Sequence, residues 1–140
     1  MKKQGLPLLV GVALLLAGSL LYVGCESDDT NQNITATLFQ VERDLGSYDG
    51  TDVYDWDTTL SQAHFDIRIK DFHAGDAAIE VYDATGKLLL LRALVAPNYT
   101  IYSGDHEFVS VGQTAHGTPG HWVVKLSYNQ FTGDQKITLQ

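Results

Sequence analysis

Five aspartates and no lysine or arginine fall between residues 44 and 57, together with glycines that allow a tight loop. Calcium binds several oxygen ligands at once, and carboxylates clustered in a flexible loop supply them. The stretch is therefore a candidate calcium site, with Asp49, Asp52, Asp55 and Asp57 as its expected ligands. Its spacing departs from the EF-hand loop, which ends a regular series of acidic residues with a glutamate. A solvated acidic loop without metal is the alternative.

Two aromatic residues in the same stretch, Tyr54 and Trp56, suggest a second kind of site. Aromatic rings stack on the C–H faces of sugars while neighbouring carboxylates bond the hydroxyl groups. Tyr54 and Trp56 are therefore candidate ligand-binding residues. The alternative is that both rings cover one end of the core, because large aromatic side chains are mostly buried.

The histidines and serines form no recognisable catalytic or metal-binding series. His116 and His121 flank a short turn, but two ligands alone do not make a transition-metal site. Ser103, Asp105 and His106 share one turn, whereas a catalytic triad is assembled by the fold. We therefore expect a protein that is not an enzyme. A small hydrolase is the alternative, because any two of the 17 acidic residues can meet as a catalytic pair.

The single cysteine, Cys25, stands at the end of an apolar N-terminal stretch. Lys2 and Lys3 precede an apolar run over residues 6–23, and Gly24 supplies a small residue before the cysteine. This pattern resembles a bacterial lipoprotein signal peptide. The resemblance implies that residues 1–24 are removed and that Cys25 is lipidated, with palmitate among the expected acyl chains. It also implies a place in the cell envelope, anchored to the outer membrane or the cell surface.

Other interpretations of the leader are an uncleaved membrane anchor and ordinary secretion, since about 18 apolar residues just reach the thickness of a bilayer core. Residues 25–33 are polar and acidic, which predicts a flexible tether. The start of this tether, residues 25–29, is similar to the acidic run that some Bacteroidetes lipoproteins use as a surface-export signal. A merely solubilising tether is the alternative.

Charge and cysteine content narrow the possible partners. The chain carries a net charge of −8, and without Lys2 and Lys3 its 17 acidic residues face only seven basic ones, a net charge of −10. Such a surface repels phosphate backbones, so we expect no nucleic-acid partner. With no second cysteine for a disulfide, the domain must be held together by its core alone. Envelope proteins, glycans and cations are the expected partners, and calcium is the only cofactor suggested.

Hydrophobic residues beyond the tether recur with period two. Phe65, Ile67 and Ile69 alternate with polar residues, and so do Trp122, Val124 and Leu126. Turn residues separate seven or eight such short strands, one of them at 99–102, and residues 129–133 should bend the chain. The pattern predicts an all-β fold, a jelly-roll-like antiparallel β-sandwich, over residues 34–140.

The segments 78–86, 117–126 and 131–133 together resemble the small jelly-roll domains appended to secreted bacterial peptidases, namely pre-peptidase C-terminal domains and P domains. The resemblance covers roughly residues 60–140 and implies a fold without implying an activity. We therefore expect a lipid-anchored envelope protein with a non-catalytic binding or scaffolding role. A calcium-dependent or carbohydrate-binding module and a small hydrolase are the alternatives.

The anchor gives the first testable prediction. Cys25→Ala should leave an uncleaved precursor that incorporates no fatty acid, because the lipid is carried on the cysteine sulfur. Metabolic labelling with a fatty acid and fractionation of membranes measure both effects. Labelling that survives the substitution would refute lipidation at Cys25.

Overall fold

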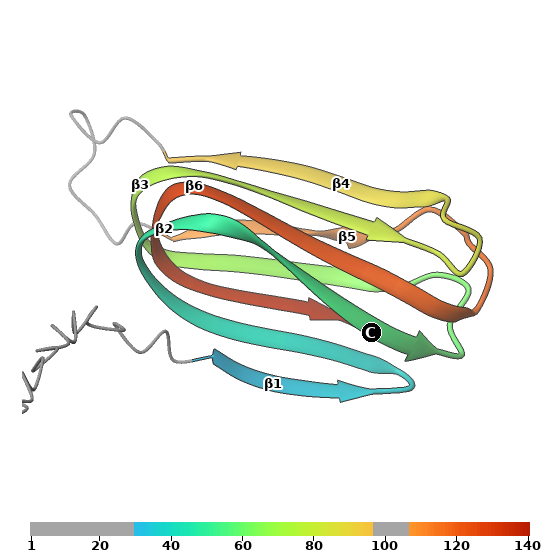
Figure 1. Ribbon diagram of the computed structural model, residues 1–140. Helices are drawn as coiled ribbons and strands as arrows, with labels where there is room; N and C mark the ends of the chain where they lie inside the picture. The colour runs from blue at the N-terminus through green and yellow to red at the C-terminus, as the bar shows by residue number, and fades with distance from the viewer. Residues whose placement is uncertain (1–29, 97–106) are drawn as a thin grey trace, which may run out of the picture.

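The computed structural model describes residues 30–96 and 107–140 (Figure 1). The predicted leader, Cys25 and the predicted strand at 99–102 lie outside the described residues. The strands are β1 (Thr30–Thr35), β2 (Leu38–Thr58), β3 (His64–Tyr82), β4 (Leu88–Val95), β5 (Phe108–Gln113) and β6 (Gly120–Leu139). Within the described residues, no helix is long and apolar enough to cross a bilayer.

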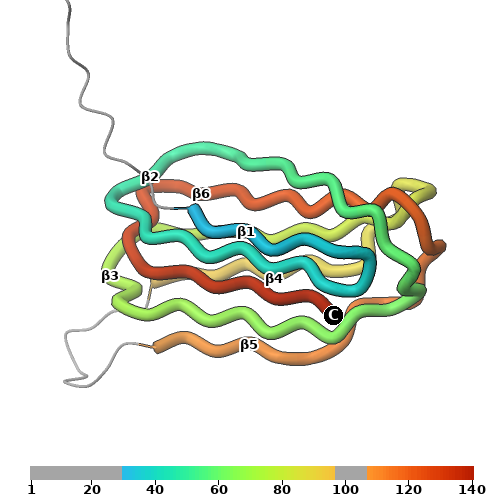
Figure 2. Tube along the Cα trace, turned by 90° about the horizontal axis from the view of Figure 1, so that it is seen from below, coloured from blue at the N-terminus to red at the C-terminus, as the bar shows by residue number. Residues whose placement is uncertain are grey.

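Three of the strands are unusually long and pair with one another. β2, β3 and β6 have 21, 19 and 20 residues, and β6 lies between the other two in antiparallel register. Each of the three bends near its middle, so the hydrogen-bonded sheet doubles back on itself (Figures 1 and 2). One bent sheet therefore forms both layers of a sandwich.

The two layers differ in size. The first, which we call the five-stranded layer, consists of β1, residues 38–45 of β2, 133–139 of β6, 64–70 of β3, and β5. The second, the four-stranded layer, consists of residues 50–58 of β2, 120–128 of β6, 76–82 of β3, and β4. At one side of the sandwich, β1 has no strand opposite it among the described residues.

Backbone conformation explains why the three strands bend at one level. The register shifts occur between residues 45 and 50 of β2 and between 70 and 76 of β3. Ser47, Asp71 and Gln130 have φ of 54°, 48° and 48°, and Gly75 has φ of 78°. Such left-handed residues interrupt the extended ladder as a bulge does, which turns the strand direction.

The core lies between the layers and is built from alternate residues of the long strands. Phe65, Ile67 and Ile69 of β3 are fully buried, as the period-two pattern predicts. Across the sandwich they face Trp122, Val124 and Leu126 of β6, which are also inaccessible to solvent. Rings of Trp56 and Trp122 meet edge to face with centroids 5.4 Å apart.

The predicted all-β antiparallel sandwich is confirmed, with two differences in detail. The described residues hold six strands, because β2, β3 and β6 each run through both layers, and the predicted strand at 99–102 lies outside them. β1 begins at Thr30, so the last residues of the predicted tether pair with β2. The predicted bend at residues 129–133 is confirmed within β6, where Gln130 has a positive φ.

The bend gives a second prediction, at Gly75. A Cβ atom there would lie 2.3 Å from the backbone oxygen of Gln130, and its φ of 78° disfavours any side chain. Gly75→Ala should therefore lower the free energy of unfolding by at least about 2 kcal/mol.

The control for Gly75 is Gly46→Ala, because a Cβ at Gly46 meets nothing within 4 Å. That variant should be unchanged or up to about 1 kcal/mol more stable, since alanine reduces the freedom of the unfolded chain. Urea denaturation of both variants measures the difference. Equal stability of the two would contradict the described bend.

Candidate functional site

The acidic stretch is part of a strand and not a loop. Residues 50–58 of β2 pair with β6 in continuous register, so successive side chains point to opposite faces. Asp52 points between the layers, whereas Asp49, Asp55 and Asp57 are on the exposed side. The fold therefore divides the four expected calcium ligands between two faces.

Asp52 is the partner of a buried guanidinium. Arg43 lies between the layers with its side chain 6% exposed, and its Nη1 donates to Asp52 Oδ2. Tyr48 donates its hydroxyl to Asp52 Oδ1 at 3.3 Å. The Arg43 Cζ atom lies 4.8 Å from the centre of the Tyr48 ring and 5.5 Å from that of Tyr128. This ion pair, which packs against two tyrosine rings, therefore links the two halves of β2.

Burial and charge in this cluster shift several pKa values. Desolvation raises the pKa of Tyr54 and of Tyr128 above the usual range. Desolvation alone would lower the pKa of Arg43, but its hydrogen bond to Tyr48 and the charge of Asp52 together raise it. Arg43 therefore remains positively charged inside the sandwich.

Asp55 and Asp57 both contact a histidine on the exposed side of the four-stranded layer. His121 Nε2 lies 3.1 Å from Asp55 Oδ1, and His121 Nδ1 lies 3.0 Å from Asp57 Oδ1. The hydrogen bond to Asp57 and the charge of Asp55 raise the pKa of His121 above its ordinary value. The two carboxylates thus favour the protonated form of His121, whose positive charge offsets part of their negative charge.

The remaining expected ligand, Asp49, accepts a hydrogen bond from the backbone N–H of Gln130 at 2.7 Å. It therefore helps to hold the bend of β6. No group of three or more metal-ligating side chains occurs within residues 30–96 and 107–140. The calcium site stays a prediction, with its expected ligands engaged in other contacts.

The candidate sugar-stacking rings face the core. Trp56 is fully buried and donates its Nε1–H to the Thr35 carbonyl at 2.6 Å. Tyr54 is half-buried, and its ring packs edge to face against Phe39 with centroids 5.6 Å apart. This arrangement agrees with the alternative that these rings cover the core. Only the half-buried Tyr54 keeps part of its surface near the layer edge.

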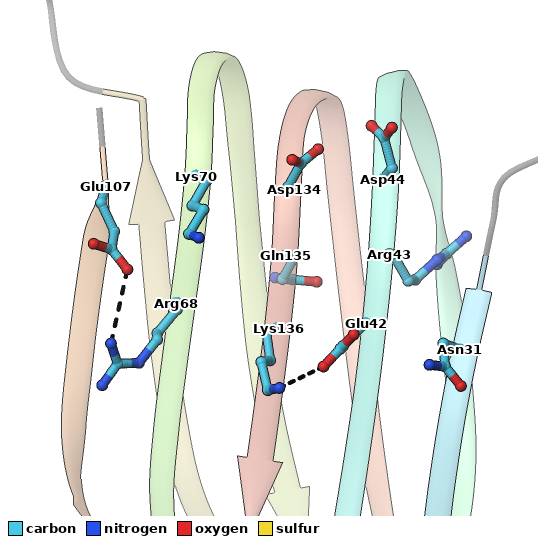
Figure 3. Close-up of a pocket in the computed structure, with 10 residues that line it drawn as sticks. All are labelled: Asn31, Glu42, Arg43, Asp44, Arg68, Lys70, Glu107, Asp134, Gln135 and Lys136. Carbon is cyan, nitrogen blue, oxygen red and sulfur yellow. Dashed lines mark ion pairs between the residues drawn. The ribbon is translucent and has the colours of Figure 1, made fainter. Parts of the chain in front are cut away.

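A hollow of about 550 Å³ lies on the outer face of the five-stranded layer, opposite the core (Figure 3). Every lining residue is polar or charged, and charges of both signs occur among them. The residues are Asn31, Glu42, Arg43, Asp44, Arg68, Lys70, Glu107, Asp134, Gln135 and Lys136. They come from four strands of the layer, β1, β2, β6 and β3, and from Glu107 just before β5, so the sheet itself fixes their spacing. The side chains of Arg43 and Gln135 are themselves buried between the layers.

Cross-strand ion pairs order one half of the hollow. Lys136 Nζ lies 2.5 Å from Glu42 Oε1 on the neighbouring strand. Arg68 bonds the Asp66 carboxylate through two nitrogens, at 2.9 and 3.2 Å, and its Nη1 lies 3.8 Å from Glu107. These contacts hold both cations on one row across the sheet.

The other half of the hollow contains two adjoining carboxyl groups. Asp44 and Asp134 lie directly opposite each other on β2 and β6, and Lys70 lies across from Asp134 on β3. Desolvation, followed by the hydrogen bond and negative charge of Asp44, raises the pKa of Asp134. The nearby Asp44 carboxyl group therefore makes ionisation of Asp134 less favourable.

Sequence reasoning did not identify the hollow. The alternation in 64–70 predicts that Arg68 and Lys70 lie on the solvent face, and the one in 136–140 predicts the same for Lys136. Alternation does not predict which strands pair. Only the pairing of β2, β6 and β3 brings these residues beside Glu42 and Asp134. The predicted calcium and ligand-binding residues lie elsewhere, between residues 49 and 57 of β2.

Comparisons with known proteins identify no family. No family model matches the chain, and no curated protein matches it. Among solved structures, it is similar to a chain described as a "Glycosylation Associate Protein" complex from Streptococcus agalactiae, with a TM-score of 0.32 and 9% sequence identity. The match covers 79% of this chain and 38% of that chain. A similarity of this size carries no argument about function.

The buried ion pair gives a third prediction, which also separates a structural role from a calcium site. Asp52→Asn leaves the Arg43 guanidinium without its carboxylate between the layers. It should lower the free energy of unfolding by about 2–3 kcal/mol, less than for a fully buried pair because Asp52 is 27% exposed. Asp55→Asn and Asp57→Asn, on the exposed side, should have much smaller effects.

Thermal melts of these variants with calcium, with magnesium and with chelator complete the test. The Asp52→Asn loss should be the same in all three conditions if Arg43 is its cause. A loss that appears only with calcium would instead assign Asp52 to a metal site, because a bound ligand stabilises the folded state alone.

Proposed function

We propose that this protein is a lipid-anchored component of the cell envelope that binds a polar partner without catalysis. The observation that carries the proposal is the hollow on the five-stranded layer, where charged groups of both signs are fixed on adjacent strands. Such a surface is complementary to a ligand rich in hydroxyl and charged groups, such as an envelope glycan. Binding at such a site needs little conformational change, because the sheet already positions the side chains.

The spacing between Cys25 and β1 supports a position close to the membrane. Five residues of chain from Cys25 to Thr30 reach at most about 18 Å. Thr30 pairs with Arg43, just before the β2 bend. With Cys25 lipidated, the bent end of the sandwich would be held near the outer membrane or cell surface. The hollow would then lie close to the anchor, because its residues on the long strands are next to the bends.

A second candidate function is hydrolysis, and the specific observation in its favour is the pair Asp44 and Asp134. Two carboxyl groups whose environment raises one pKa provide an acid and a base side by side. The ion pairs of Glu42 and Arg68 in the same hollow suit recognition better, because they hold the charges in place. We therefore propose binding as the main function.

The binding proposal predicts that Lys136→Ala and Arg68→Ala each weaken binding about tenfold or more, the cost of one lost charge-assisted hydrogen bond. The chain from residue 26, which keeps every described strand, is screened against charged and neutral glycans and then measured by calorimetry. Lys125→Ala is the matched control. Its ammonium pairs with Glu80 at 2.8 Å in the other layer.

Three results would contradict the proposal. They are a screen in which no glycan is retained, an equal loss of affinity in Lys125→Ala, and turnover of a retained glycan. Turnover that disappears in Asp134→Asn would establish the hydrolase in place of the binding protein.

A further inference from the structure

The second half of β2, residues 50–57, has hydrogen-bonding groups on an open side. These residues pair with β6 on one side. β1 pairs only with residues 38–43 of β2, and no other described strand pairs with β2. We call residues 50–57 the β2 edge. Unpaired N–H and C=O groups on such an edge are a template for an added strand.

The five-stranded layer extends beyond the β2 edge by one strand. Ile34 and Gln32 of β1 are in register with Phe39 and Val41 of β2. The β2 residues are buried, whereas both β1 residues are exposed, Ile34 by 38%. The core stops there because the four-stranded layer has no strand opposite β1. The missing position is one strand wide, about 4.8 Å.

The charge of the β2 edge favours one class of occupant. Asp55 and Asp57 have side chains 72% and 88% exposed, and the two carboxylates share one histidine, His121, so negative charge remains on this face. Lys125 on the neighbouring strand pairs with Glu80. A second copy of this chain would bring the same carboxylates against Asp55 and Asp57, and like charges on paired strands repel. A strand that carries lysine or arginine would face opposite charges instead.

We propose that the β2 edge binds an extended basic polypeptide segment of a partner protein, which adds as a fifth strand to the four-stranded layer. Its apolar side chains would cover Ile34 and the exposed part of Tyr54. Its basic side chains would point to the other face, beside Asp55 and Asp57. This site is separate from the hollow, which lies on the outer face of the other layer, and it stands whether or not the hollow binds a glycan.

The probe is a synthetic peptide of roughly eight residues, a common strand length, in which lysine alternates with valine or threonine. It is added to the chain from residue 26, and amide hydrogen exchange is measured residue by residue. Binding should slow exchange at alternate amides of residues 50–57, whose N–H groups face the open side. Amides of β4, the other edge of that layer, should not change.

Controls separate strand addition from general attraction to an acidic protein. The same peptide with glutamate for lysine should not bind, and neither should a lysine peptide N-methylated at alternate residues on its pairing edge. The double variant Asp55→Asn, Asp57→Asn should weaken binding about fivefold to tenfold, whereas Glu80→Gln, on the same face but two strands away, should not.

The proposal is overturned if the lysine peptide does not bind, or if it protects β4 or β5 instead of residues 50–57. Equal affinity of the glutamate peptide would also overturn it, as would a dimer of this chain protected at the β2 edge. Lys136→Ala should leave peptide binding unchanged, so a failure here is distinct from a failure of the hollow.

Discussion

The simultaneous bending of β2, β3 and β6 is the constraint on which the rest of the structure depends. Because these strands are hydrogen-bonded neighbours, one cannot turn between layers unless the others turn at the same level. Left-handed backbone at Ser47, Asp71 and Gln130 places the three turns together. The core, the hollow and the open β2 edge all follow from where those turns occur.

The bend also explains why a charged residue lies inside the sandwich. It places Arg43 in one layer opposite Asp52 in the other, nine residues later on the same strand. The bulge between residues 45 and 50 changes which residues of β2 point inward, from odd-numbered to even-numbered positions. Asp52, Tyr54 and Trp56 consequently face the core, while Asp55 and Asp57 remain in solvent.

Periodicity alone predicts much of the fold. The alternations at Phe65–Ile69 and Trp122–Leu126 identify side chains that are fully buried, and the turn residues after Tyr128 predict the β6 bend. These patterns predict burial correctly because each of these strands has one buried and one solvent-exposed face. Pairing between distant segments decides which layer each half-strand joins. The periodicity of a single strand does not predict that pairing.

The site was harder to predict for the same reason. The aspartates and glycines of residues 44–57 are typical of a loop, and their composition concealed a strand. The alternation of Tyr54, Trp56 and Thr58 with Asp55 and Asp57 was the available signal for that strand. β1 gave no signal, because an edge strand exposed on both faces has no hydrophobic period. The hollow depends on the pairing of several strands, so no local pattern indicates it.

The bend of β2 can be measured directly by nuclear Overhauser contacts between the rings of Phe39 and Trp56. These residues lie on one strand, yet their ring centroids are 6.0 Å apart. Over the same 17 residues a straight strand would separate them by about 55 Å. The doubled sheet predicts strong contacts between the two rings, together with contacts between Phe39 and Tyr54. Absence of both sets in a folded sample would contradict the bent sheet.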